Sequence, residues 1–209
     1  MKKNNKGFTL IELLAVITIM GILMLVGIPA IGRTIENVRR DSFANITGEY
    51  VNAVRNAINA EDLVCKQAAS ETDFSNAVSA SAAIEGTYYV RINTEETTTT
   101  DLMEKGGRSP YGNAHMYGYV KFVKEWDEDT GKSKTTYSVR MQDSGKHGLK
   151  STDDAGANKF EFKESELTRS NVVSNTEIES KTVVSGTTVA NPAIVAPPSS
   201  EGALECKVQ

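Results

Sequence analysis

The sequence predicts an α+β protein in which one long N-terminal helix packs on an antiparallel β-sheet, followed by an extended C-terminal tail. Three observations support this fold class. Residues 8–28 form an almost uninterrupted apolar run, residues 35–64 repeat apolar side chains at helical spacing, and residues 135–141 alternate as a half-buried strand does. The 209 residues are enough for one ordinary domain with an appendage.

The first element is the apolar run from Phe8 to Ile28, whose single charged residue is Glu12. As a helix, this run would be about 32 Å long, which is enough to cross the hydrocarbon core of a bilayer. Three lysines and no acidic residue precede it. Because basic residues favour the cytoplasmic side, we expect a single-pass membrane protein whose remaining chain lies on the far side.

Two simpler interpretations of the N-terminus are a cleaved secretory signal peptide and a plain signal anchor. The apolar run exceeds the roughly 7–15 residues of signal peptides, and Ile28-Pro29-Ala30 fits a cleavage site poorly. Neither interpretation explains why the run contains Glu12. A charged residue raises the free energy of inserting a helix into a membrane by roughly 2.5–3.5 kcal/mol, and by less near a helix end. A cut between Gly7 and Phe8 would create an amine one helical turn before Glu12, and in an assembly the amine of one copy could meet Glu12 of another.

Residues 6–14, KGFTLIELL, resemble the class III signal of type IV pilins and pseudopilins. The resemblance implies that a prepilin peptidase cuts after Gly7, which removes the leader 1–7, and methylates the new N-terminal Phe8. It also implies that Glu12 docks to the N-terminal amine of Phe8 in a neighbouring subunit during filament assembly. The pilin-like fold class of such proteins agrees with the α+β prediction.

The same resemblance implies partners and a location. A cytoplasmic membrane protein would leave the bilayer through an inner-membrane assembly platform and associate with itself and other pilins in a helical filament. The result would be an extracellular pilus or pseudopilus on the cell surface. The runner-up hypothesis is a pseudopilin or minor pilin of a type II secretion or competence (DNA uptake) system. A third is a membrane-anchored surface binding module that never polymerises.

The helix is expected to continue past residues 8–31, which would form the transmembrane and filament-core helix. Pro29 removes a helical hydrogen bond and would kink the helix, as the resemblance to pilins also implies. Residues 32–67 are predicted to be an amphipathic continuation that ends near Gln67 and needs a sheet to cover its apolar stripe. This stripe consists of Ile35, Phe43, Ile46, Tyr50, Ala53, Ala57 and Val64.

A cluster of charged residues follows the membrane segment, and two interpretations of it stay open. One is an ordinary solvated helix face. The other is pairing between subunits of a filament. The cluster consists of Arg33, Glu36, Arg39, Arg40 and Asp41.

The globular head is predicted between residues 68 and 149. Ser70 and Asp73 have capping-box spacing and would begin a short helix. A first strand is expected at Gly86–Ile92, followed by a β-hairpin whose turn contains Asp129-Thr130-Gly131. The two hairpin strands are expected at residues 117–126 and 135–141.

The C-terminal region, residues 150–209, is polar and weakly patterned. Its alternating segment Lys159–Lys163 and the segment Thr182–Val189 are candidate strands. The prolines and serines between residues 192 and 200 predict an extended tail.

Cys65 and Cys206 allow one intramolecular pairing, which we expect in an exported chain. The bridge would fasten the tail to the end of the long helix, and two free thiols are the alternative. For a loop of this length, the chain-entropy model gives about 4–5 kcal/mol as an upper guide.

No enzyme activity, cofactor or metal site is predicted. The chain lacks the nucleophile, phosphate-loop and metalloprotease motifs, and His115 and His147 are expected to be exposed loop residues. The acidic run Asp127–Asp129 lacks the ligand series of a calcium loop and is interpreted as a charged hairpin tip. With a net charge of −4 and no basic excess, no direct nucleic-acid site is identified.

Overall fold

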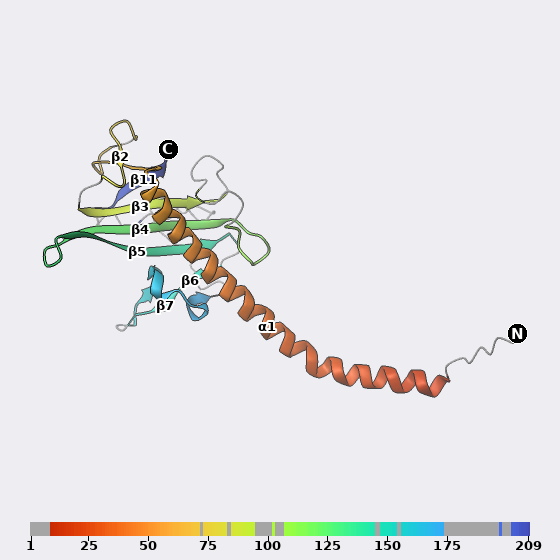
Figure 1. Ribbon diagram of the computed structural model, residues 1–209. Coiled ribbons are helices and arrows are strands. Elements are labelled where there is room, and N and C mark those ends of the chain that lie inside the picture. The colour runs from red at the N-terminus through yellow and green to blue at the C-terminus, as the bar shows by residue number, and fades with distance from the viewer. Residues whose placement is uncertain are drawn as a thin grey trace, which may run out of the picture. The chain divides into compact units, whose positions relative to one another are not determined.

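The computed structural model describes residues 9–71, 73–82, 85–94, 102, 107–144, 147–153, 156–173, 197 and 202–209. The α+β prediction is confirmed, because one long helix occurs with a mixed, mostly antiparallel sheet (Figure 1). The chain divides into two units, Met1–Arg39 and Arg40–Gln209, and the long helix contributes residues to both.

The long helix α1 (Leu10–Asn59) ends in a hydrogen-bonded cap that no glycine marks in the sequence. Glu61 adopts a left-handed conformation with φ 63°, and the N–H of Asp62 donates to the carbonyl of Ala57 at 3.0 Å. This is the Schellman arrangement, in which glycine usually occupies the left-handed position. The predicted end near Gln67 is therefore wrong, because a glutamate takes the place of the glycine that marks most such ends.

Within the described residues, nine strands form one sheet in the order β10-β6-β5-β4-β3-β11-β1-β2, and β9 pairs with β5. A separate ladder joins β7 to β8. Paired strands are antiparallel, except that β11 and β3 are parallel. The strands are β1 (Leu63–Cys65), β2 (Val78–Ser79), β3 (Gly86–Asn93), β4 (Met116–Asp127), β5 (Lys132–Asp143), β6 (Gly148–Leu149), β7 (Ser151–Thr152), β8 (Asn158–Lys159), β9 (Phe162–Lys163), β10 (Val172–Val173) and β11 (Leu204–Val208), with short 3-10 turns η1 (Glu164–Glu166) and η2 (Arg169–Asn171).

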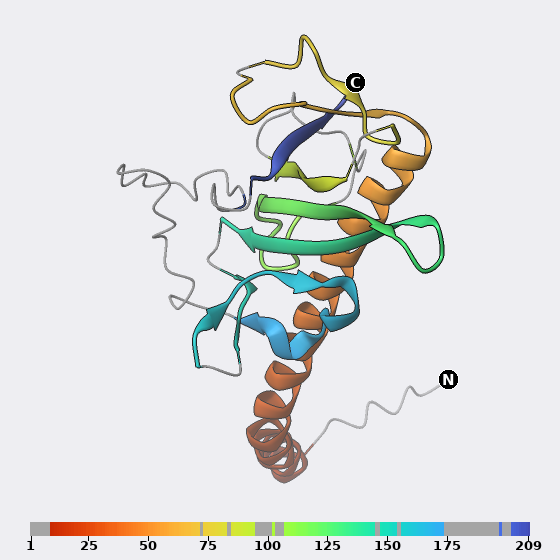
Figure 2. The same ribbon diagram turned by 90° about the vertical axis from the view of Figure 1, so that its left-hand side faces the viewer.

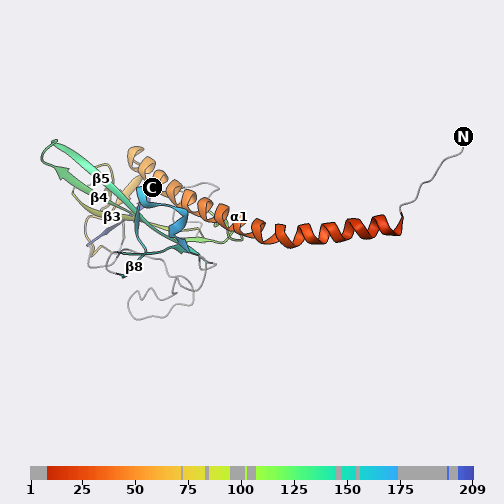
Figure 3. The same ribbon diagram turned by 90° about the horizontal axis from the view of Figure 1, so that it is seen from below.

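Strands β3, β4 and β5 form the centre of the sheet, which confirms the predicted first strand and hairpin. The pairing of β3 with β4 ends at Gly86 and Lys124, so the hairpin tip extends beyond β3 (Figure 3). At the tip, Oδ1 of Asp127 accepts the N–H groups of Asp129 and Thr130 at 3.0 and 3.1 Å. The acidic run is thus a turn in which the first carboxylate satisfies backbone donors.

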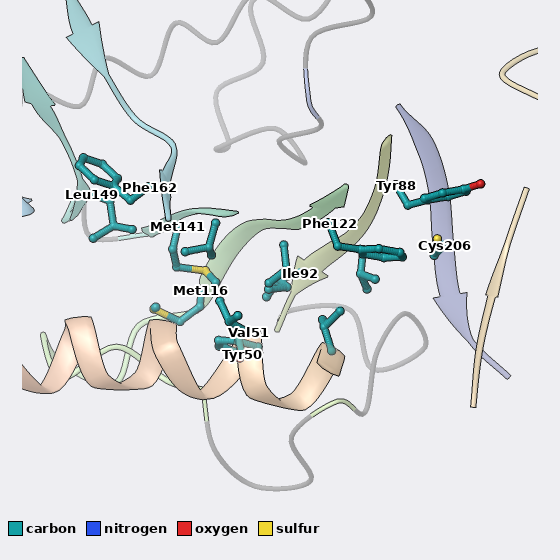
Figure 4. Packing of buried hydrophobic residues seen from close by; sticks show 14 of the residues in the cluster. Tyr50, Val51, Tyr88, Ile92, Met116, Phe122, Met141, Leu149, Phe162 and Cys206 are labelled. Carbon is teal, nitrogen blue, oxygen red and sulfur yellow. The ribbon is translucent and has the colours of Figure 1, made fainter. Parts of the chain in front are cut away.

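The core lies between the second half of α1 and the central strands (Figure 4). Figure 4 shows Tyr50 and Val51 of the helix facing Met116, Ile92 and Phe122 of the sheet. Burial of such side chains contributes roughly 1.5–3 kcal/mol each, so this contact stabilises the head.

The predicted helix stripe is only partly correct. Phe43 and Tyr50 are buried, but Ala53 and Ala57 lie at the edge of the buried face and Ile35 is 47% exposed. Larger side chains that the stripe omits are buried instead, because they fill more of the space under the sheet. These are Val51, Val54 and Ile58.

The last strand, β11, lies inside the sheet between β3 and β1 (Figure 2). Leu204 pairs with Tyr88 of β3, and Cys206 faces Cys65 of β1. The sequence predicts no strand here, and Cys65 belongs to β1 rather than to the end of the long helix. The proposed strand at 182–189 lies outside the described residues, as does the predicted tail except for Pro197.

Two further local predictions differ from the structure. The expected edge strand at Lys159–Lys163 is divided between β8 and β9, which pair with different neighbours. No helix begins at Ser70 among the described residues of this loop, because the Asp73 carboxylate accepts the N–H and the hydroxyl of Ser75 in a local turn.

Candidate functional site

The described part of the N-terminus begins at Thr9, directly after the predicted cleavage position. Gly7 and Phe8 lie outside the described residues, so cleavage between them and methylation of Phe8 stay predictions. The first described residues nevertheless include Glu12, whose unexplained charge is the central feature of the sequence.

Glu12 has a hydrogen-bonding partner within its own chain. Its Oε2 accepts the backbone N–H and the hydroxyl of Thr9, both at 2.9 Å, while the N–H of Glu12 lies 3.3 Å from Oγ1 of Thr9. This reciprocal arrangement is a capping box, with Thr9 as the N-cap and Glu12 at the third helical position. The Thr-x-x-Glu spacing of residues 9–12 is the signal of this box in the sequence.

The two oxygens of the Glu12 carboxylate differ in their surroundings. Both bonds from Thr9 go to Oε2, and among the described residues Oε1 accepts no hydrogen bond. A carboxylate oxygen can accept two hydrogen bonds, so Oε1 keeps the capacity to meet a donor from outside the chain.

Apolar side chains cover the helix after Glu12 on all sides. Between Leu10 and Ile31, the large apolar side chains that the structure describes are exposed by 50% at Val16 to 82% at Leu10. A contiguous apolar surface of this kind marks a site of contact with a membrane or another protein. Among the residues with a described placement, no helix combines the length and hydropathy that a membrane span requires.

Pro29 lies within α1, and the backbone stays helical through it. Proline has no N–H, so the carbonyl four residues earlier loses its helical donor. The predicted kink at Pro29 stays a prediction, and the lost hydrogen bond is its physical basis.

A family model described as the prokaryotic N-terminal methylation motif matches residues 2–28. These residues carry the class III signal of type IV pilins and pseudopilins. Comparison with curated proteins and with solved structures finds no match. The matched residues 2–28 contain Gly7 and Phe8, the Thr9–Glu12 capping box and most of the exposed apolar helix.

The chain that carries the class III signal also has a disulfide in its head. Cys65 and Cys206 are bonded, so the predicted pairing is present in the structure. The bridge joins the facing strands β1 and β11, and beside it the Nζ of Lys66 contacts Glu205 at 3.0 Å. The disulfide therefore holds the last strand of the head in its interior position.

A polar cluster lies on the strands β4 and β5 of the head. The Glu161 carboxylate accepts hydrogen bonds from the hydroxyls of Tyr119 at 2.7 Å and Ser138 at 2.8 Å, and pairs with Lys121 at 2.6 Å. Burial opposes the charged form of Glu161, but the bonds from Lys121, Tyr119 and Ser138 outweigh it, so the pKa of Glu161 lies below its ordinary value. This cluster fixes the segment before β9 to the sheet.

His147 is not the exposed loop residue that the sequence predicts. Its ring stacks on Tyr111 with centroids 3.7 Å apart, and its N–H donates to Asp143 at 2.8 Å. Asp143 is buried and also accepts the hydroxyl of Ser109, so these residues join the loop before β4 to the end of β5. His115 is half-buried and contacts Thr94 and Arg108.

The described residues contain no group of three or more His, Cys, Asp or Glu side chains arranged to hold a metal ion. The acidic hairpin turn is no exception, because Asp127 uses its carboxylate on backbone donors. The function is therefore inferred from the class III signal and the exposed apolar helix.

Proposed function

We propose that this chain is the precursor of a type IV pilin-like structural subunit of a cell-surface filament. The class III signal on a helix whose apolar side chains are exposed carries the proposal. A prepilin peptidase removes residues 1–7 by cutting after Gly7, and the amine of Phe8 is methylated. The chain is held in the cytoplasmic membrane by residues 8–31 before assembly, with its head on the far side.

Assembly transfers the apolar helix from lipid to a bundle of identical helices. In that bundle the Glu12 carboxylate of one subunit docks to the N-terminal amine of Phe8 in a neighbour. The Oε1 atom of Glu12 supports this role, because the capping box occupies only Oε2 and no described residue donates a hydrogen bond to Oε1. Hydrophobic packing supplies the strength of the filament core, and the charge pair supplies its register.

The mature N-terminus tests the proposal. Mass spectrometry of the chain from its native cells is expected to show methylated Phe8 as the first residue. A chain that retains Met1 or begins near Ala30 contradicts the proposal and identifies a plain anchor or a cleaved signal peptide.

Abundance then separates a major pilin from a minor pilin or pseudopilin. Quantitative mass spectrometry of sheared filaments is expected to find this chain as a main component of a pilus. A trace amount assigns it to the minor subunits or to a secretion or DNA-uptake system.

A further inference from the structure

An exposed tryptophan lies on the hairpin of the head. Among the described residues from Arg40 onward, Trp126 is the most exposed large apolar side chain, with 55% of its surface accessible. It lies beyond β3, because the pairing of β3 with β4 ends at Gly86 and Lys124 (Figure 3). Its backbone N–H donates to Oε1 of Glu85 at 2.7 Å. Tryptophan offers a large, flat apolar face and is enriched where proteins contact other molecules.

A pocket of about 200 Å³ lies at the same end of the sheet and shares Glu85 with this contact. We call it the Tyr88 pocket. Its apolar wall is formed by Val78 of β2, Ala82, Tyr88 of β3 and Leu204 of β11. Pockets for drug-sized ligands enclose roughly 300–1,000 Å³, so the Tyr88 pocket has room for one small ring.

Contacts with β4 fix two sides of the Tyr88 pocket. The ring of Tyr88 stacks on Phe122, with centroids 5.3 Å apart (Figure 4). Lys124 is buried, and its Nζ donates to the carbonyl groups of residues 80 and 81, next to the wall residue Ala82. Phe122, Lys124 and Trp126 alternate along β4 and therefore share one face of the sheet. The pocket is thus already formed without a ligand, on the face that also presents the tryptophan.

The polar lining of the Tyr88 pocket offers hydrogen-bond acceptors. Nε2 of Gln67 donates to the carbonyl of Asn76 at 2.6 Å, and Oε1 of Glu85 accepts the N–H of Trp126. Among the described residues, no group donates to Oε1 of Gln67 or to Oε2 of Glu85. Each of these oxygens can accept two hydrogen bonds, so a ligand has to bring donors. Lys66 also lines the pocket and balances the charge of Glu85, so the lining favours an uncharged ligand.

A sugar ring combines these properties, because it is uncharged, has hydroxyl donors along its edge and presents apolar C–H groups on its faces. We propose that the Tyr88 pocket binds one neutral ring of a saccharide, whose hydroxyl groups donate to Gln67 and Glu85, and that Trp126 stacks on the next ring. A stable protein interface buries roughly 1,200–2,000 Å², which a single exposed apolar side chain does not supply. The site lies within the head, so the proposal does not depend on the filament.

The fluorescence of Trp126 tests the proposal directly, because the chain contains one tryptophan. The full chain, purified in a detergent without a sugar headgroup, is titrated with maltose, cellobiose, lactose and diacetylchitobiose. At least one disaccharide is expected to cause a saturable shift of the emission to shorter wavelength as its second ring covers the indole. A Kd of about 1–10 mM is expected for a ligand with so few atoms. No saturable shift with any of them up to about 100 mM overturns the proposal.

Two exposed lining residues locate the bound sugar. Gln67→Leu and Glu85→Ala are each expected to weaken binding of the disaccharide about tenfold, because each removes an acceptor. Glu125→Ala is the matched control, since Glu125 is an exposed acid on the other face of β4, and it is expected to leave the affinity unchanged. Unchanged affinity in both lining variants overturns the proposal, because the sugar then binds elsewhere.

Calorimetry separates the pocket from the stacking platform. Trp126→Ala is expected to lower the affinity for the disaccharide about tenfold, to nearly that of its methyl monosaccharide, and to leave the affinity for the monosaccharide unchanged. An unchanged affinity for the disaccharide contradicts the role of Trp126. Glucosamine and glucuronic acid carry opposite charges and are expected to bind more weakly than glucose. Tighter binding of either one contradicts the assignment of a neutral sugar.

Discussion

Thr9 and Glu12 satisfy each other's hydrogen-bonding groups across the first turn of α1. The two donors of Thr9 lie 2.9 Å from Oε2 of Glu12. An acidic side chain at the start of an exposed apolar helix therefore has an ordinary local role, in addition to any role in assembly. The two roles are separable, because the cap needs an acceptor and docking to an amine needs a charge.

Glu12→Gln is expected to preserve the cap and abolish incorporation into filaments. Glutamine suits the third position of a capping box, but it offers no negative charge to the amine of Phe8. The measurement is the amount of the variant in sheared filaments, relative to the amount of processed chain in the membrane. Normal incorporation of the Gln variant would reduce the role of Glu12 to capping.

Thr9→Ala is the converse change, because it removes the cap and leaves the charge. Loss of an N-cap side chain costs about 0.5–2 kcal/mol of helix stability. We expect the start of α1 to fray, with faster amide hydrogen exchange at residues 10–12, while incorporation into filaments continues. Cleavage after Gly7 is followed in parallel, so that a defect in processing is not mistaken for a defect in assembly.

Removal of the disulfide with Cys65→Ser and Cys206→Ser is expected to destabilise the head severely. The two cysteines are 141 residues apart, and the chain-entropy model gives about 4–5 kcal/mol for such a loop as an upper guide. Urea unfolding of the purified chain measures the free energy of unfolding. Wild type treated with a reductant is expected to match the double variant, and equal stability with and without the bridge would contradict this prediction.

The stability of the head is expected to fall in acid, in part through Glu161. Its pKa in the folded chain lies below the ordinary value of 4.5, so its charged form stabilises the fold above that value. This contribution is lost as the pH falls from about 4.5 through the folded pKa. Urea unfolding as a function of pH measures the loss, and Glu161→Gln is expected to be less stable at neutral pH and to show a shallower decline. An unchanged pH dependence in that variant would rule out Glu161 as a source of the decline.

Gly118→Ala is expected to disrupt the pairing of β4 with β5. A Cβ atom at this position would lie 2.0 Å from the carbonyl oxygen of Arg140, and its φ of +156° disfavours other residues. Gly112→Ala is the matched control, because it also has a positive φ but meets no atom within 4 Å. The control is expected to cost about 1–2 kcal/mol of unfolding free energy, and Gly118→Ala clearly more. Similar losses of unfolding free energy in the two variants would show that β4 and β5 can separate at this position without a loss of stability.

The sequence by itself determined the features that depend on local patterns. The class III signal is a continuous motif, the long helix follows from its apolar repeat, and the β4–β5 hairpin follows from alternation and a turn containing Gly131. Each of these depends on residues that are close in the chain, so a single sequence contains the information. The paired cysteines also follow, because two cysteines allow one intramolecular bridge.

Only the tertiary structure decided where α1 ends, which of its residues are buried and where the last strand lies. Glu61 adopts the left-handed backbone conformation that glycine usually occupies at a helix end. Val54 and Ile58 are buried because a sheet formed by residues distant in the chain covers them. The strand β11 pairs with Tyr88 and Cys65, both more than a hundred residues earlier in the chain. Such pairing depends on the geometry of the whole sheet, and a local pattern of side chains does not contain it.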